Sequence, residues 1–135
     1  MIYRAGWIEK NMGVSRKSLR VYEAKGLISP AINKRNNKYR DYTERDLVDI
    51  WNIKLLRGLG VPLSEIKMVL LNTAKLGEVL ESRIAELEAE VERLERNIRV
   101  AVMIREAGKL PEPPEMGSVT YSDYLNDLCE KGCRL

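Results

Sequence analysis

The segment that most constrains the fold of this chain runs from Ser15 to Pro30 and reads SRKSLRVYEAKGLISP. It combines a helix start, a helix body and a helix stop in one short stretch. Serine is a favourable N-cap residue, Gly26 suits the left-handed conformation that ends many helices, and Pro30 cannot continue a helix. The segment therefore predicts a short, self-contained helix between Ser15 and Gly26.

The predicted helix has a cationic face and an apolar face. Arg16 and Arg20 are four residues apart and lie on the same side, with Lys17 next to them. Leu19 points in another direction and can anchor the helix to a core. Residues 6–14 read as a first short helix ended by a glycine turn, so the two helices predict a helix-turn-helix.

A different pattern begins at Leu80, where apolar residues alternate four and three positions apart through about Arg105. This spacing is typical of a coiled-coil seam, and a helix from about Gly77 to Ala107 would be roughly 45 Å long. So long a helix needs a partner, which we expect to be a second copy of the chain. The residues expected to dimerise are Leu80, Ile84, Leu87, Val91, Leu94 and Ile98.

The seam favours a coiled coil of two helices but leaves the relative orientation of the helices open. Its β-branched residues and leucines, considered alone, indicate a parallel pair. Glu88, Glu90 and Glu95 place like charges near the seam in either arrangement. The flanking charges therefore do not decide between a parallel and an antiparallel pair.

Two further helices are predicted between the two patterns. Thr43 followed by Asp46 resembles a capping box and opens a helix that Gly60 ends, and Pro62 starts the next one. Apolar residues at helical spacing should pack behind the cationic helix as core. They are Leu47, Ile50, Trp51, Leu55 and Leu59 in the first helix, and Leu63, Ile66 and Leu70 in the second.

One long series of residues has a highly specific order and spacing. It comprises Gly6, Gly13-Val14-Ser15, Leu19-Arg20, Tyr22-Glu23, Gly26-Leu27, Ser29-Pro30, Tyr39-Arg40, Tyr42, Asp46-Leu47, Ile50, Lys54-Leu55-Leu56-Arg57, Gly60, Leu63 and Glu65-Ile66. Over about the first 70 residues, with few gaps, this series resembles the MerR family of bacterial transcription regulators.

The resemblance implies a mainly α fold, in which a winged helix-turn-helix DNA-binding domain precedes a long dimerisation helix that forms an antiparallel coiled coil. It places DNA against the second helix, the wing and the end of the following helix. Tyr22 has two interpretations, because its hydroxyl could meet the DNA backbone or its ring could pack inside. The residues expected to bind DNA are Ser15, Arg16, Lys17, Arg20, Tyr22, Tyr39, Arg40 and Arg57.

Three positions depart from the family pattern. Lys38 stands where a glycine usually precedes the Tyr-Arg pair, so the turn of the wing predicted over residues 31–42 would rely on Asn37. A small residue, usually alanine, is common where Glu9 stands, and an acidic residue where Trp7 stands. We therefore expect the first helix to be rotated or to expose its tryptophan.

The chain is predicted to contain three parts. Residues 1–75 form the DNA-binding domain, residues 76–107 the coiled-coil dimerisation helix, and residues 108–135 a linker with a short C-terminal segment. Three prolines make residues 108–114 an extended linker. A short helix without an evident core of its own is expected over residues 118–131, and this segment could begin an effector domain.

Charge is distributed unevenly along the chain. Residues 1–60 contain 13 Lys and Arg against 6 Asp and Glu, a net +7, whereas residues 61–135 contain 10 against 14, a net −4. The basic half favours a polyanionic partner and salt-sensitive binding. No apolar stretch approaches the ~20 residues of a membrane span and no signal peptide is evident, so we expect a cytoplasmic protein without a membrane partner.

The sequence offers little for catalysis or metal binding. It contains no histidine, no phosphate-cradling glycine loop and no acidic pair in a plausible pocket, so an enzyme is not expected. Cys129 and Cys133 are one helical turn apart and could reach one soft metal ion. Metal sensors of the family, however, place cysteines directly after the dimerisation helix. We therefore expect reduced thiols, no metal and no cofactor.

Together these patterns predict a DNA-binding transcriptional regulator. The resemblance implies a homodimer that binds a near-palindromic, double-stranded promoter and distorts its spacer in response to an effector, so that RNA polymerase is affected indirectly. The effector would be an unknown small molecule. The alternative is an architectural or excisionase-like DNA-bending protein, a class that generally lacks a long dimerisation helix. A third interpretation, a coiled-coil scaffold with a basic head, predicts no preference for one DNA sequence.

Overall fold

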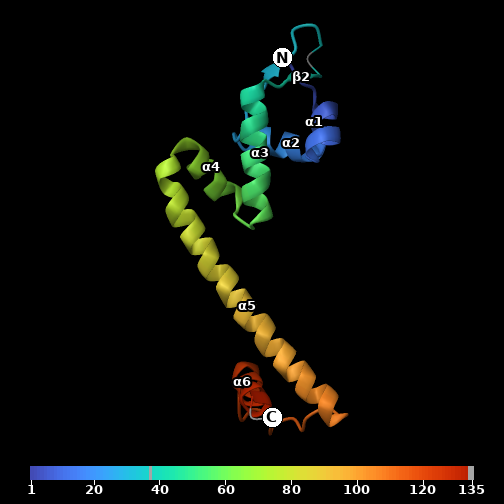
Figure 1. Ribbon diagram of the computed structural model, residues 1–135, viewed down its shortest axis with the longest axis vertical. Coiled ribbons are helices and arrows are strands. Elements are labelled where there is room, and N and C mark those ends of the chain that lie inside the picture. Colours follow the sequence, from blue (N-terminus) through green and yellow to red (C-terminus); the bar gives the residue numbers. More distant parts are fainter. Residues whose placement is uncertain (37, 134–135) are drawn as a thin grey trace. The chain divides into compact units, whose positions relative to one another are not determined.

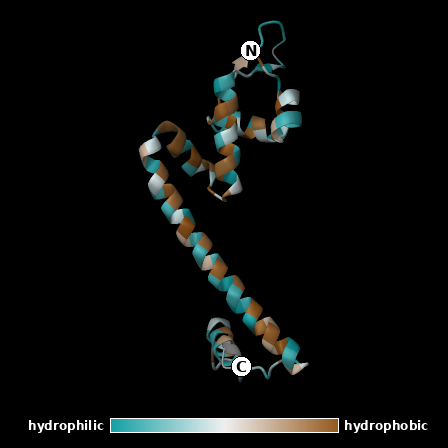
Figure 2. Ribbon diagram, viewed as in Figure 1, coloured by the Kyte–Doolittle hydropathy of each residue, from teal (hydrophilic) through white to brown (hydrophobic). Residues whose placement is uncertain are grey.

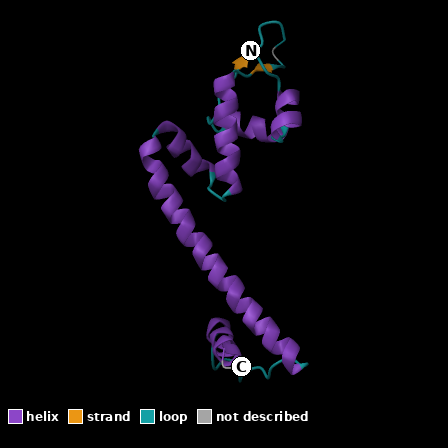
Figure 3. Ribbon diagram, viewed as in Figure 1, coloured by secondary structure: helices purple, strands orange, loops and turns teal. Residues whose placement is uncertain are grey.

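The computed structural model describes residues 1–36 and 38–133, and only the backbone of residues 132 and 133. The chain divides into two compact units, Met1–Arg83 and Ile84–Leu135. Helices dominate, and the two short strands belong to the first unit (Figures 1 and 3). The elements are α1 (Ala5–Met12), α2 (Arg16–Ala24), β1 (Ala31–Ile32), β2 (Arg40–Asp41), α3 (Glu44–Gly58), α4 (Leu63–Leu71), the 3-10 helix η1 (Thr73–Lys75), α5 (Leu76–Ala107) and α6 (Tyr121–Cys133).

The first unit has one hydrophobic core, to which α1 to α4 and the start of α5 contribute. Leu19, the residue expected to anchor α2, is only 2% exposed. Its burial holds one side of α2 against the core and leaves the opposite side to solvent. The most deeply buried side chains of this core are Ile8, Leu19, Ile50, Ile53, Val61 and Ile66.

The turn between α1 and α2 is held by backbone conformation and by a contact from α3. Gly13 has a φ of 69°, a left-handed conformation that favours glycine. The Lys54 Nζ of α3 donates a hydrogen bond to the Gly13 carbonyl oxygen at 3.0 Å. The helix-turn-helix is thus fastened to the helix behind it.

A small antiparallel hairpin follows α2 and confirms the wing predicted over residues 31–42. A bridge between Tyr3 and Tyr42 adds the N-terminal segment to its base, with backbone N···O distances of 2.8 and 2.9 Å. The predicted role of Asn37 in the turn lies outside the described residues. The paired residues of the hairpin are Ala31 with Asp41 and Ile32 with Arg40.

The helices after the wing begin and end where the sequence indicates. α3 starts at the predicted capping box, in which the Asp46 N donates to the Thr43 Oγ1 and the Thr43 N donates to the Asp46 Oδ2. Gly60, with a φ of 89°, follows the end of α3. Pro62 occupies the N-cap position of α4.

Both tryptophans of the chain are substantially exposed. Trp7 is 42% exposed, one of the two outcomes expected for the first helix, and its ring centroid lies 4.4 Å from that of Tyr3. Trp51 is 54% exposed, and two further α3 residues predicted for the core are exposed as well, Leu55 at 60% and Leu59 at 43%. The prediction that these three residues belong to the core is wrong. α3 contacts the core through a row of residues three positions apart, and Trp51 lies outside that row. The buried row consists of Ile50, Ile53 and Leu56.

α5 is one continuous helix of 32 residues, close to the bounds predicted from the seam. Its first turns belong to the core of the first unit, where Val79 is buried and Leu80 is packed against the same cluster. The Arg83 Nε donates a hydrogen bond to the Leu59 carbonyl oxygen at 2.6 Å. Leu80, one of the residues expected to dimerise, therefore packs against the core of the first unit of its own chain.

Beyond Leu80 the predicted seam residues are solvent-exposed in the single chain. Leu87 is 36% exposed and Ile98 61%, with Ile84, Val91 and Leu94 between these values. Figure 2 shows apolar positions recurring between hydrophilic ones along α5. Within the described part of the chain, no helix combines the length and the hydrophobicity required to cross a bilayer.

α6, the short helix expected near the C-terminus, has no core of its own and instead forms a small core together with the C-terminal half of α5. Leu128 and Cys129 of α6 are buried together with Val100 of α5, and further apolar residues of both helices pack around them. Val100 and its neighbour Met103 lie on the side of α5 opposite the seam. α6 therefore covers one face of α5 and leaves the seam uncovered.

Candidate nucleic-acid interface

The ends of α2 are fixed by local hydrogen bonds that the sequence predicted. The Ser15 Oγ accepts a hydrogen bond from the Ser18 N at 3.0 Å, as expected of an N-cap. At the other end Gly26 has a φ of 75°. The Leu27 N donates to the Tyr22 carbonyl oxygen at 2.9 Å, and the Gly26 N to that of Glu23 at 3.0 Å. This pair of bonds is a Schellman motif, which stops the helix after Ala24.

The exposed side of α2 carries the cations that the sequence assigns to DNA. Arg16, Lys17 and Arg20 are exposed, whereas Leu19 is buried. Tyr22 is half-buried and packs against the core of the first unit, which agrees with the packing interpretation of this residue. The three cations can reach a polyanion without disturbing the core.

The wing is joined to α2 by an ion pair. The Arg40 Nε of β2 donates to the Glu23 Oε1 of α2 at 2.8 Å, and the two side chains are 30% and 33% exposed. Tyr39 is 55% exposed, and the Arg4 guanidinium lies 5.6 Å from the centroid of its ring. Arg4 is also paired with Asp41 of β2. The wing, α2 and the N-terminal segment are therefore connected by charged contacts.

These elements enclose a hollow of about 430 Å³, called here the cationic hollow. Five of its lining residues are arginine or lysine, and one is acidic. A concave surface with this charge suits a phosphate backbone, because the cations converge on one region. The lining residues are Arg4, Ala5, Arg16, Leu19, Arg20, Glu23, Lys38, Tyr39, Arg40 and Tyr42.

Tyr42, one of the residues that line the cationic hollow, has a shifted pKa. Burial raises the pKa of Tyr42 above its usual value of 10.0, and the negative charge of Glu23 adds to the rise. Arg40 opposes this effect, while Asp46 contributes to it more weakly. The Tyr42 side chain is consequently uncharged wherever the protein works near neutral pH.

The structure brings together half of the residues predicted to bind DNA. Arg16, Arg20, Tyr39 and Arg40 line the cationic hollow, whereas Ser15, Lys17, Tyr22 and Arg57 are not among its lining residues. Arg57 lies in the last turn of α3. The sequence interpretation missed Arg4, which reaches the hollow because Tyr3 pairs with Tyr42. No local pattern signals that pairing, since the two tyrosines are distant in the sequence.

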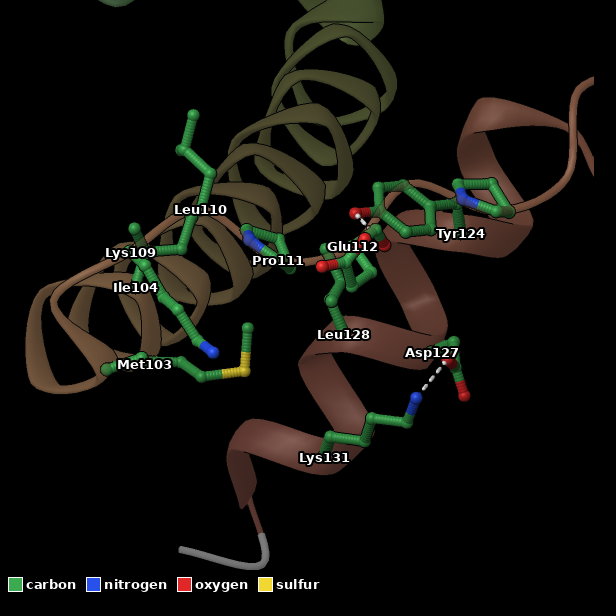
Figure 4. A pocket seen from close by; sticks show the side chains of 12 residues that line it. Met103, Ile104, Lys109, Leu110, Pro111, Glu112, Tyr124, Asp127, Leu128 and Lys131 are labelled. Atoms are coloured by element: carbon green, nitrogen blue, oxygen red, sulfur yellow. Dashed lines mark hydrogen bonds and ion pairs between the residues drawn. The ribbon is translucent and has the colours of Figure 1, made fainter.

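A second hollow, of about 400 Å³, lies within the second unit, between the end of α5, the following linker and α6 (Figure 4). Met103 and Ile104 of α5 form one side, and Leu128 of α6 forms another. The Tyr124 hydroxyl donates to the Glu112 carbonyl oxygen at 3.4 Å. Its remaining lining residues are Ala107, Lys109, Leu110, Pro111, Pro114, Asp127 and Lys131.

The cysteines give no sign of a metal site in the described residues. Cys129 is buried, and the Arg99 Nε lies 3.3 Å from its Sγ. The side chain of Cys133 lies outside the described residues. Across the part of the chain that is described, no three His, Cys, Asp or Glu side chains are grouped as metal ligands.

The helix-turn-helix, the wing and the following helices coincide with a known sequence family. A family model described as "MerR HTH family regulatory protein" matches residues 3–73, which is more than half of the chain. The chain belongs to the MerR family. The matched MerR region contains α1 to α4 and every residue of the cationic hollow.

Curated MerR-family relatives are regulators rather than enzymes. The chain is 32% identical over 101 residues to the heavy metal-dependent transcription regulator 2 of Rhizobium meliloti, covering 70% of this chain and 68% of that protein. It is 38% identical over 65 residues to the multidrug-efflux transporter 1 regulator of Bacillus subtilis, covering 48% of this chain. It spans only 23% of the length of that regulator.

The fold also resembles that of a solved MerR-family structure. This is HiNmlR, described as a MerR family regulator lacking the sensor domain and bound to promoter DNA. The TM-score is 0.55 at 22% sequence identity, and the match covers 84% of this chain and 100% of HiNmlR. At this identity the likeness concerns the MerR fold alone.

Proposed function

We propose that this MerR-family regulator binds a near-palindromic promoter as a homodimer and distorts the spacer DNA in response to an effector. The observation that carries the proposal is the cationic hollow. It combines side chains from the recognition helix α2, the wing and the N-terminal segment on one concave surface. HiNmlR, which shares the fold, is bound to promoter DNA.

The cations of α2 and the wing have complementary tasks in the proposed complex. Arg16, Lys17 and Arg20 lie on the helix that helix-turn-helix proteins present to the major groove, where base edges carry sequence information. Tyr39 and Arg40 contact the phosphate backbone and fix the register. Ser15 contributes from the start of α2, and Arg57 meets phosphate from the end of α3, whereas Tyr22 supports α2 by packing against the core.

Homodimerisation is supported by the uncovered seam of α5. Ile84, Leu87, Val91, Leu94 and Ile98 remain 36% to 61% exposed even though α6 packs on the same helix. A row of large apolar residues at heptad spacing requires a second helix. Two heads joined in this way would occupy the two half-sites of a near-palindrome.

Spacer distortion and effector response are the remaining parts of the proposal. A stiff pair of α5 helices would fix the distance between the two DNA-binding domains. The dimer would then favour DNA that is bent or untwisted to match this distance, and RNA polymerase would be affected through the altered DNA. The hollow between α5 and α6 is the place proposed for the effector, because its volume and largely apolar lining suit a small molecule.

The seam can be tested by placing charges on it. Replacing Leu87 and Leu94 together by glutamate should convert the dimer into a monomer that no longer binds a full operator. Each buried leucine contributes on the order of 1.5–3 kcal/mol, counted twice in a symmetric dimer. Light scattering coupled to size-exclusion chromatography gives the mass, and titration with an operator selected from random duplexes gives the affinity.

A matched control places the same charges on the opposite side of α5. Ser82 and Ala89 are exposed positions away from the seam, and their double replacement by glutamate should leave a dimer that binds the operator. If the Leu87 and Leu94 variant stayed dimeric with unchanged operator affinity, the two-headed mechanism would be wrong. If both variants were dimers and bound all duplexes with the same affinity, the result would favour the coiled-coil scaffold with a basic head instead.

A further inference from the structure

Glu9 of α1 reaches the start of the recognition helix. Its Oε2 accepts a hydrogen bond from the backbone N of Arg16, the first residue of α2, at 3.0 Å. The Glu9 side chain is exposed. This contact lies at the helix end that helix-turn-helix proteins present to DNA.

The contact compensates an unfavourable charge arrangement at the start of α2. A helix N-terminus carries a partial positive charge and unpaired amides. α2 begins with Arg16 and Lys17 and has no acidic residue in its first turn. Ser15 satisfies the amide of Ser18, and Glu9 satisfies that of Arg16 while supplying the missing negative charge. Without Glu9, the amide of Arg16 would be available to an external anion.

We propose that Glu9 is a specificity-determining residue that keeps DNA phosphates away from the N-terminus of α2. Its carboxylate accepts the hydrogen bond from the Arg16 amide that a phosphate would otherwise accept, and its negative charge repels that phosphate. A duplex that lacks the operator sequence binds in many registers through its phosphates, so an additional phosphate-binding position would raise its affinity most. The operator is held in one register by base contacts and gains less. Glu9 thereby increases discrimination between the two.

The Glu9→Gln variant isolates the charge, because its amide oxygen can still accept the hydrogen bond from Arg16. Affinities are measured against a random-sequence duplex and against an operator selected from a random pool, at several salt concentrations. We expect the random duplex to bind about three- to tenfold more tightly and its salt slope to steepen by up to ~0.9. Operator affinity should rise less, so the ratio of the two affinities falls.

Two further variants complete the design. Glu130→Gln removes the same charge from an exposed position on α6, and it should change neither affinity. Glu9→Ala removes both the charge and the hydrogen bond, so it should bind the random duplex more tightly than the wild type but unfold at a lower temperature than Glu9→Gln. The difference in unfolding temperature between the two Glu9 variants measures the contribution of the hydrogen bond to stability. The increase in random-duplex affinity that both variants share measures the effect of the charge.

Three results would overturn the proposal. Glu9→Gln could match the wild type on the random duplex, in which case no phosphate is being excluded. It could lose operator affinity alone, which would make Glu9 a base-contacting residue, or lose both affinities equally, which would make it only a structural cap. The proposal rests on DNA binding by this chain. A wild type that bound neither duplex would refute that function itself, a result distinct from the other three.

Discussion

Arg40 of the wing and Glu23 of the recognition helix form an ion pair at 2.8 Å, inside the hollow proposed to receive DNA. Glu23 is the one carboxylate among the lining residues of that hollow. The pair therefore holds the wing against α2 and at the same time neutralises an anion that would repel phosphate. Arg40 therefore joins the wing to α2 and neutralises Glu23. The family resemblance had suggested only that Arg40 contacts the DNA backbone.

Arg40→Ala should weaken DNA binding by more than the loss of one phosphate contact, because it also leaves Glu23 unpaired in the cationic hollow. We expect about a tenfold loss, part of which the double variant Arg40→Ala with Glu23→Gln recovers. Fluorescence anisotropy with a labelled duplex measures the cycle, and Arg45→Ala on α3 is the control. Additive effects of the two substitutions would show that the pair does not matter for binding.

Arg20→Ala should reduce operator affinity by about 1–3 kcal/mol and relax the preference at one base position. Alanine is a good helix former, so α2 should keep its stability. Binding titrations against operator variants, together with thermal unfolding, separate the two effects. An intact fold with unchanged affinity would remove Arg20 from the interface.

Lys17→Ala should weaken binding to all duplexes by a similar factor, because a phosphate contact carries no sequence information. The slope of log affinity against log salt should become shallower by ~0.9. Titrations at several salt concentrations provide this slope. A slope equal to that of the wild type would place the Lys17 ammonium away from the DNA backbone.

Ser15→Ala should destabilise the first unit by about 1 kcal/mol, since the amide of Ser18 loses its acceptor. Ser15→Asp keeps an acceptor at the same position and should retain most of the stability. Urea unfolding followed by circular dichroism compares the three proteins. Equal stability of the alanine and aspartate variants would mean that the cap contributes little here.

The pKa of Tyr42 predicts a loss of stability in alkaline solution. Because burial and Glu23 raise this pKa in the folded state, the unfolded chain loses its proton first. The contribution is complete below the unfolded value of about 10 and declines as the pH rises toward the folded value. Unfolding free energies measured from about pH 8 to pH 11 should fall more steeply for the wild type than for Tyr42→Phe. Parallel curves would contradict this origin.

The sequence predicted those elements whose signals are local. Ser15 and Gly26 bound α2, Thr43 and Asp46 open α3 with reciprocal hydrogen bonds, and the heptad pattern predicted the extent of α5. Each of these features depends on neighbours within one or two helical turns. The resemblance supplied the family, which the match to residues 3–73 confirms.

Features set by distant contacts were predicted less well. The face that α3 buries depends on how it packs against other helices, so its spacing alone did not reveal that Trp51 is exposed. Arg4 reaches the cationic hollow through the Tyr3–Tyr42 bridge, a pairing without a local signal. The C-terminal segment lacked an evident core because the surface that covers it belongs to α5, on the side away from the seam.

α5 presents one face to α6 and another to the proposed second copy, and these faces share few residues. Under the proposed dimer, substitutions that alter the α6 contact, such as changes at Val100 or Leu128, should leave the contact between the two copies unchanged. Substitutions along Leu87 and Leu94 leave the α6 contact intact. In evolutionary terms, the proposed arrangement would let a lineage replace the segment after the long helix, and with it the proposed effector site, while inheriting the same proposed dimer contact.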